Sequence, residues 1–412
     1  MNRLSSTPSA TRTEGALQQM ESRRHSATWD TRSKAWSILT CASSGGAESE
    51  DLRSLLREPM DWSAILELAE EHGVVVHLAE ALRDQPGSGS VPREILEKIQ
   101  HRRRRQTAST LGMAAELFRL LELFETAGIP VLAIKGPVLS MRAYGDPGFR
   151  QYGDLDFLVR SKDVAGATRI LETGGYHSRV SLDAIQGGRV PGEYLFRMAS
   201  GGILVELHTE KSLRYFPKPL PIDEYFARQS RVKIDARAVP AMSAEDEFVH
   251  ACIHGSKHVW ERLAWIADVA ALLRNGSVDV GATTESARRV GALRMLMLGA
   301  TLAAEVLHVP VPRQWNGNPA DRSSVAKIAA EIVRRLPSGA TGDLGIWRRA
   351  AYRVATGGGG MAGLFYFGKL TCSTTEKDWL SADDSTESAL RGFPRRLRRL
   401  AKLYGHPRRR VF

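Results

Sequence analysis

Two aspartates, Asp154 and Asp156, stand at positions i and i+2 of a segment that reads as a β-strand. Side chains alternate faces along a strand, so both carboxylates point one way while Leu155 and Phe157 point the other way. Two like charges held this close repel each other in a partly buried site. A hard divalent cation resolves the repulsion, because Mg²⁺ binds one or two carboxylates together with the phosphate oxygens of a substrate. The pair therefore predicts a metal site that faces a phosphate-bearing ligand.

A third acid, Glu206, lies inside the otherwise apolar segment 203–207. A lone carboxylate in a buried strand is costly without a partner. On a strand beside Asp154 and Asp156, Glu206 would complete a set of three carboxylates around a metal; the alternative is a solvent-facing position on a half-exposed hairpin. Because the paired aspartates are present, we favour the three-carboxylate site. His208 shares the strand face of Glu206, and we expect it to orient a carboxylate or a phosphate.

The elements that must position these residues can be read from hydrophobic runs and turn residues. The apolar run 131–134 has the length of a buried strand and ends at Lys135, Gly136 and Pro137. Further along, we expect a strand at 154–159, a helix at 162–173 with Ser161 as N-cap, a strand at 176–182, and a hairpin of 194–199 and 203–208. Alternation of this kind predicts an α/β or α+β domain.

The flanking regions are predominantly helical. Asp61 and Gly73 mark the two ends of one helix, and a long helix from Pro92 towards residue 126 carries an apolar face of Leu117, Leu120, Leu121 and Phe124. The predicted division is a disordered segment 1–34, an N-terminal helical region 35–127, a core domain 128–240, a helical domain 241–340, and a Gly/Arg-rich C-terminal region 341–412 with a basic tail. A loop is expected at 85–90.

Composition favours a cytoplasmic protein. Of 412 residues, 43% are hydrophobic and 25% charged, as in ordinary globular proteins. The three cysteines, Cys41, Cys252 and Cys372, lie far apart and predict neither a disulfide framework nor a zinc site, which suits a reducing compartment. The first 34 residues have no apolar stretch typical of a secretory signal, and no run approaches the roughly 18–20 apolar residues of a membrane span.

Basic and glycine-rich stretches are less specific. The net charge is +11, and the tail 391–412 is rich in arginine, so it could contact nucleic acid or an anionic surface weakly, or form a solvated helix. The run HRRRR at 101–105 spreads over all faces of a helix, which favours a solvated surface. The glycine run 357–360 lacks the G-K-[ST] ending of a phosphate loop and is interpreted as a connection.

A row of histidines, His250, His254 and His258, recurs every four residues and lines one helix face. The row could bind a metal with Asp268, or it could belong to a packed helix whose histidines contact the core domain; we favour the second. If one of them acts on a substrate, His258 is the first choice, because Trp260 and Trp265 lie nearby.

The ordered set of these residues resembles a known superfamily. Lys135–Gly136, then Arg150, then Asp154 with Asp156, and finally Glu206–Leu207–His208 are similar to the nucleotidyltransferases that include DNA polymerase beta, and to the bacterial group of uncharacterised nucleotidyltransferases in particular. Further matches, at Asp61–Trp62, at 72–74, in the histidine row and at 265–268, extend the resemblance over roughly residues 60–310.

The resemblance implies a polymerase-beta-like α+β core that transfers a nucleoside monophosphate from a nucleoside triphosphate, such as ATP, to an acceptor. The acceptor, whether small molecule, peptide or protein, is not identified. Asp154, Asp156 and Glu206 would be catalytic and would hold Mg²⁺ or Mn²⁺, with Glu206 helping to deprotonate the acceptor. The residues implied in nucleotide binding are Lys135, Gly136, Arg150, His208 and His258.

One departure from the superfamily matters for activity. Members usually have Gly-Ser after the first strand, whereas this chain has Gly136–Pro137 and so lacks a hydroxyl for the phosphate. The sequence therefore leaves two alternatives to the enzyme: a non-catalytic module that binds a nucleotide or a partner, and an RNA-directed enzyme.

Overall fold

The computed structural model describes residues 32–45, 50–83, 91–186, 192–199, 201–210, 216–218, 222–276, 278–339, 344–373 and 396–398. Three predictions concern residues outside these ranges: the disordered segment up to residue 31, the loop at 85–90, and most of the basic tail. Residues 32–34, the end of the predicted disordered segment, belong to a helix described up to residue 43, so the prediction is wrong for these three residues.

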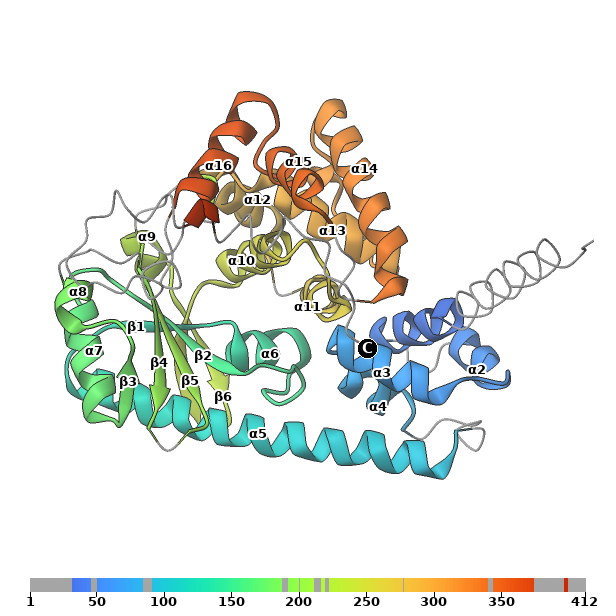
Figure 1. Ribbon diagram of the computed structural model, residues 1–412, viewed down its shortest axis with the longest axis horizontal. Helices are drawn as coiled ribbons and strands as arrows, with labels where there is room; N and C mark the ends of the chain where they lie inside the picture. The colour runs from blue at the N-terminus through green and yellow to red at the C-terminus, as the bar shows by residue number, and fades with distance from the viewer. Residues whose placement is uncertain are drawn as a thin grey trace, which may run out of the picture.

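A seven-stranded mixed sheet forms the centre of the described chain, in the order β3-β4-β5-β2-β1-β7-β6. The strands are β1 Val131–Ile134, β2 Asp154–Val159, β3 Tyr176–Ser178, β4 Glu193–Met198, β5 Leu204–His208, β6 Ser230–Ile234 and β7 Arg237–Ala241. β1 is antiparallel to β2 and parallel to β7, whereas β2 and β5 run parallel. Helices flank this sheet on both sides (Figure 1), so the predicted α+β class is confirmed.

The strands that carry the three acids lie in the middle of the sheet. β2 pairs with β1 on one side and with β5 on the other. From Leu155 to Val159 every residue of β2 is buried, as are all four residues of β1. Strands covered on both faces read as continuous apolar runs rather than alternating ones, which explains the run from Phe157 to Val159.

The helix α5, Arg93–Thr126, packs against one face of the sheet. Leu117, Leu120 and Phe124 of its predicted apolar face are buried, and the ring of Phe124 lies 5.5 Å from that of Phe157. The helix α7, Val164–Thr173, contributes to the same core. Figure 1 shows α5 running beneath the sheet and on beneath the N-terminal helices.

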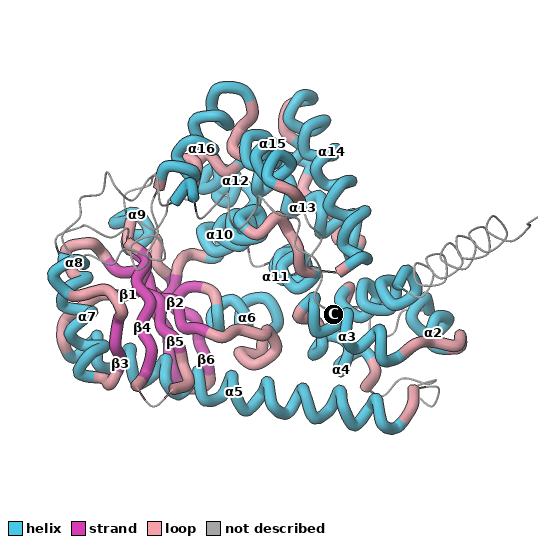
Figure 2. Tube along the Cα trace, viewed as in Figure 1, coloured by secondary structure: helices cyan, strands magenta, loops and turns pink. Residues whose placement is uncertain are grey.

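The other helices share a second core. They are α2 Glu50–Leu56, α3 Trp62–His72, α4 Val75–Ala81, α6 Gly136–Tyr144, α10 Ala244–Lys257, α11 Leu263–Arg274, α12 Val280–Arg289, α13 Leu293–Leu307, α14 Pro319–Arg335, α15 Ile346–Thr356 and α16 Gly360–Cys372. Buried side chains of α3 and α4 join those of α10 to α14 in one cluster. Figure 2 shows α10 to α16 on the side of the sheet opposite α5. The predicted division into an N-terminal and a later helical region stays a prediction.

Local signals identify the ends of α3 correctly. The Asp61 carboxylate accepts a hydrogen bond from the Ala64 N–H at 3.0 Å, as an N-cap does. Gly73 ends the helix with φ 69°, a left-handed conformation that glycine adopts without strain.

Two local predictions are wrong, and one region contains elements that were not predicted. The helix α7 begins after Asp163 instead of Ser161, because the Ser161 N–H donates to the Glu210 carboxylate at 3.1 Å and the chain first makes a turn. The strand expected at 176–182 ends at Ser178, and the short helix α8, Leu182–Gln186, follows it. The hairpin of β6 and β7 and the short helix α9, Ile222–Ala227, were not expected.

The structure shows the contacts of the arginine run 101–105 and the position of the glycine run 357–360, two stretches for which the sequence allowed more than one interpretation. Arg102 pairs with Glu70 of α3, and Arg103 pairs with Glu80 of α4 at 2.6 Å, so part of the arginine run attaches α5 to the N-terminal helices. The glycine run 357–360 connects α15 to α16, as expected for a connection.

Candidate active site

The register between β2 and β5 brings the predicted acids together. Asp156 lies directly opposite Glu206, Asp154 opposite Leu204, and Leu158 opposite His208. The expectation that Glu206 lies on a strand beside the aspartates is therefore confirmed.

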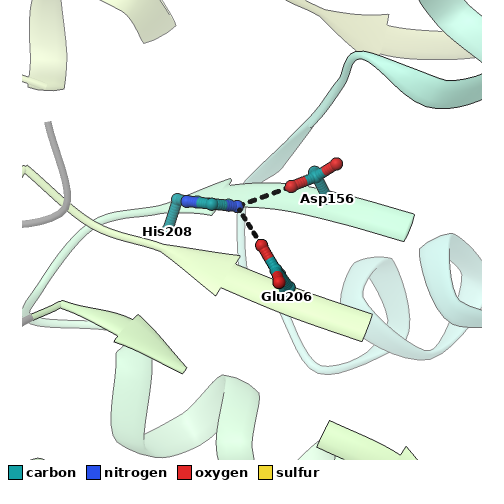
Figure 3. A group of neighbouring side chains, drawn as sticks. All are labelled: Asp156, Glu206 and His208. Carbon is teal, nitrogen blue, oxygen red and sulfur yellow. Dashed lines mark hydrogen bonds and ion pairs between the residues drawn. The ribbon is translucent and has the colours of Figure 1, made fainter. Parts of the chain in front are cut away.

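Asp156 is the centre of this group. One of its carboxylate oxygens, Oδ1, lies 2.7 Å from Lys135 Nζ and 2.6 Å from His208 Nε2. His208 Nε2 is also 3.4 Å from Glu206 Oε2. Figure 3 shows the imidazole pointing at both acids. Asp156 and His208 are buried, whereas Glu206 is partly exposed and can meet a ligand.

The cations beside Asp156 set the ionisation of the group. Burial alone would raise the pKa of Asp156, but Lys135 and His208 hold it well below the ordinary value. Burial alone would lower the pKa of His208, but its hydrogen bonds to Asp156 and Glu206 raise it to about 9, so the imidazole is protonated at neutral pH. Burial likewise opposes the charge of Lys135, and Asp156 outweighs it and raises the pKa of the lysine.

Asp154 remains the incompletely neutralised acid. Its burial, followed by the charges of Asp156 and Glu206, raises its pKa to about 6 although Lys135 and His208 act in the opposite direction. Burial and the two neighbouring carboxylates therefore outweigh Lys135 and His208 in their effect on the pKa of Asp154.

Lys135 joins β1 to α6 with an unusual backbone. Its φ is 55° and its ψ is −141°, a region that glycine occupies and other residues enter at a cost of about 1–3 kcal/mol. Gly136 follows with φ 40° and begins α6, with Pro137 in the first turn. The bend presents the lysine ammonium to Asp156 and leaves the start of a helix beside the acids.

Arg150 does not contact the aspartates of β2. Its guanidinium Nε lies 2.7 Å from Asp268 Oδ2 on α11, and the Tyr144 hydroxyl donates to the other oxygen at 3.0 Å. All three side chains are mostly buried, so this group attaches α6 and the segment before β2 to the helical domain. One signal of this group is visible in the sequence, an acid within the apolar helix α11, whereas nothing in the sequence indicated that Tyr144 takes part.

The histidines of the row lie close enough to the site for the charge of Lys135 to act on their imidazoles. Burial, with the charge of Lys135 next, lowers the pKa of His250 to about 3, and burial lowers that of His254 well below its ordinary value. Asp268 is engaged by Arg150, and among the described residues only Asp156, Glu206 and His208 form a three-residue group whose ligand atoms converge. The alternative of a metal at the histidines and Asp268 stays a prediction, and it would require Asp268 to leave Arg150.

A sequence profile described as an uncharacterised nucleotidyltransferase matches residues 58–308, more than half of the chain. The chain belongs to this nucleotidyltransferase family. A comparison with curated proteins gives no match. A solved structure, an antigenic nucleotidyltransferase-like protein from Paracoccidioides brasiliensis, aligns with 47% of this chain and 94% of its own at 15% identity and a TM-score of 0.28. A TM-score this low does not establish that the two proteins share a function or a site.

The family profile spans the chain from α3 to α13, including the whole sheet, so the acids and the histidine row both lie within it. The helices α14 to α16 lie beyond it. None of the helices in the described ranges is long and apolar enough to cross a membrane.

The donor set of this family member fits a divalent cation. One atom each from Asp156, Glu206 and His208 lies within 4.8 Å of the others, close enough for a single ion to reach them. Asp154 adds a carboxylate on the same strand face, outside the three residues whose ligand atoms converge, and burial together with the charges of Asp156 and Glu206 raises its pKa. Carboxylate oxygens are the ligands that Mg²⁺ and Mn²⁺ prefer. The side chain of His208 belongs to this converging group and also contacts the carboxylate of Asp156 at 2.6 Å.

Proposed function

We propose that the protein is a metal-dependent nucleotidyltransferase that moves a nucleoside monophosphate from a nucleoside triphosphate to an acceptor hydroxyl or phosphate. One observation carries the proposal: Glu206 lies directly opposite Asp156 on the parallel strand, beside Asp154 on the same face. Three acids with too little opposite charge around them are suited to hold a divalent cation and the phosphates bound to it.

In this proposal the carboxylates of Asp154, Asp156 and Glu206 hold the cation. When bound, such an ion withdraws charge from the phosphate oxygens and stabilises attacking and leaving oxygens. Glu206 is the most exposed member of the group whose ligand atoms converge, so we assign it the proton of the acceptor hydroxyl. His208 keeps Asp156 oriented through its 2.6 Å contact.

The triphosphate would lie at the start of α6. The first N–H groups of a helix lack partners within the helix and face an anion well. Lys135, directly before this helix, adds a positive charge that reaches the same place as Asp156. Arg150 reaches a phosphate only by leaving Asp268, so we do not assign it to the nucleotide.

A second function, nucleotide binding without transfer, is favoured by a specific observation. Lys135 and His208 already contact the same oxygen of Asp156, at 2.7 and 2.6 Å, and partly compensate it without a metal. Gly136–Pro137 also lacks the hydroxyl that superfamily members offer to the phosphate. A protein of this kind would bind the triphosphate and release no pyrophosphate.

Calorimetry with ATP in the presence and absence of Mg²⁺ tests the proposal. We expect binding that requires Mg²⁺ in the wild type and that falls at least tenfold in Asp154→Asn and Asp156→Asn. Asp183→Asn, at an exposed position of α8, is the matched control and should bind as the wild type does. Circular dichroism verifies that each variant is folded. Equal ATP binding with and without Mg²⁺, or in the two site variants, contradicts the proposal.

Pyrophosphate release separates the two functions. The wild type is incubated with Mg²⁺ and ATP together with a panel of acceptors, including the protein itself. Release that disappears in Asp156→Asn supports transfer, whereas Mg²⁺-dependent binding without release from any acceptor supports the binding module.

A further inference from the structure

An aromatic group lies on α10, on α11 and at the residue that follows α10, and the proposed function gives it no role. It consists of Trp265, His254 and His258. The ring centroid of Trp265 lies 5.0 Å from that of His258 and 5.6 Å from that of His254, and the two imidazoles are 4.7 Å apart. All three side chains are partly exposed, and Trp265 also packs against the core that the helices share.

The connections of α11 place Trp265 towards the acids. Trp265 lies three residues before Asp268, on the same side of the helix. Asp268 is bound to Arg150, which lies four residues before Asp154 at the start of β2. Trp265 therefore lies on the helix that Asp268 joins to the segment leading into the strand of Asp154 and Asp156.

The connections of α10 place the two histidines on the same side. Lys257, next to His258, approaches Glu193 of β4 with 4.0 Å between Nζ and Oε1, and Glu193 lies directly opposite His208 in the sheet. The charge of Lys135 acts on both His254 and His258. The aromatic group and the cation beside Asp156 thus belong to one region of the molecule.

The chemistry of the group suits a flat, uncharged ring. Burial lowers the pKa of His258 to about 3, so this imidazole is neutral at physiological pH. The guanidinium of Arg262 lies 5.9 Å from the Trp265 ring centroid and is itself exposed. Indole and neutral imidazole faces stack on nucleobases, which all have a π face, and a neighbouring arginine adds to such stacking.

We propose that Trp265, with His254 and His258, is the surface on which the nucleobase of the bound nucleotide stacks. The inference rests on the proposed function, since it takes the phosphates to lie at Lys135 and the three carboxylates. It assigns the base to the helical domain and the phosphates to the sheet, so the nucleotide bridges the two.

Calorimetry with two probes, ATP and inorganic tripolyphosphate, each with Mg²⁺, tests the assignment. Tripolyphosphate carries the phosphates of ATP without the base. We expect the wild type to bind ATP about tenfold or more tighter than tripolyphosphate. Trp265→Leu should lose about tenfold in ATP affinity and keep its affinity for tripolyphosphate, and Trp265→Tyr should recover most of the loss because it restores an aromatic face.

Trp36→Leu is the matched control, because Trp36 is also partly exposed and also contacts a histidine, His72, at 5.2 Å. It should bind both probes as the wild type does. Equal affinity of the wild type for the two probes, or an equal loss of both in Trp265→Leu, refutes the stacking surface and leaves the proposed function standing. A wild type that binds neither probe overturns both.

Discussion

The contact between Lys135 and Asp156 predicts a coupling between stability and cation binding. In Lys135→Met the aspartate loses one of its two positive partners, while His208 still donates to the same oxygen. The Asp156 carboxylate is 2% exposed, so water does not replace the lost ammonium. We therefore expect the variant to be less stable without a divalent cation and to bind Mg²⁺ more tightly than the wild type.

The magnitude follows from the burial of the pair. Breaking a buried ion pair by removing one partner costs about 3–5 kcal/mol, and because His208 remains we expect about 3 kcal/mol. A cation at about one hundred times its dissociation constant returns about 2.7 kcal/mol. Saturating Mg²⁺ should therefore restore most of the loss in Lys135→Met, and should stabilise the wild type less because there the ammonium competes for the same oxygen.

Urea unfolding with EDTA and with Mg²⁺, in the absence of nucleotide, measures both effects. Arg142→Met is the matched control, since Arg142 pairs with Glu247 at 2.8 Å with side-chain exposures of 11% and 4%. It should lose stability to the same extent with EDTA and with Mg²⁺. A gain from Mg²⁺ that is equal in the wild type and in Lys135→Met would refute the reasoning, because the lysine and the cation would then not share Asp156.

Two further predictions concern the scaffold and a third concerns the cation site. Burial lowers the pKa of His77 to about 3, below that of an unfolded histidine. Between about pH 6.5 and pH 3 the unfolded chain therefore binds a proton that the folded chain does not, so the free energy of unfolding falls as the pH falls through this window. His77→Phe, whose ring can keep the edge contacts to the neighbouring aromatic rings, should therefore gain about 2 kcal/mol over the wild type at pH 5 relative to pH 7.5, measured by urea unfolding; an equal difference at both pH values contradicts this. Gly255→Ala would place a methyl group 2.5 Å from the Trp260 ring and should cost about 1–3 kcal/mol, whereas Gly112→Ala, with open space around it in α5, should gain about 0.5–1 kcal/mol; thermal unfolding compares them, and similar shifts would show that the close contact relaxes. Glu206→Asn should weaken Mg²⁺ binding at least tenfold and leave the circular dichroism spectrum unchanged. Unaltered Mg²⁺ binding in calorimetry would exclude Glu206 from the cation site.

The sequence predicted the acids and their strands because their signals are local. The period of two places Asp154 and Asp156 on one face, and an acid inside the apolar strand of Glu206 required a partner. Other contacts were beyond reach because they join residues far apart in the chain. Arg150 and Asp268 are 118 positions apart, and nothing near either residue names the other.

The unexpected hairpin of β6 and β7 has a physical reason. β6 lies at the edge of the sheet, and its Arg231 and Lys233 are exposed, so it lacks the apolar run of a central strand. Pro240 in β7 is a residue that usually argues against a strand. The Ser161 cap failed for a related reason, since a tertiary contact to Glu210 replaced the local one.

The parallel pairing of β2 with β5 also has a consequence for how the site comes into being. Asp156 and Glu206 are joined by a crossover that contains α7, β3 and β4, and parallel pairs need such a long connection. Non-local pairings of this kind form slowly, because loop closure precedes the contacts that reward it. We therefore expect a cation bound at the carboxylates, which requires the completed pairing of β2 with β5, to slow unfolding without accelerating folding.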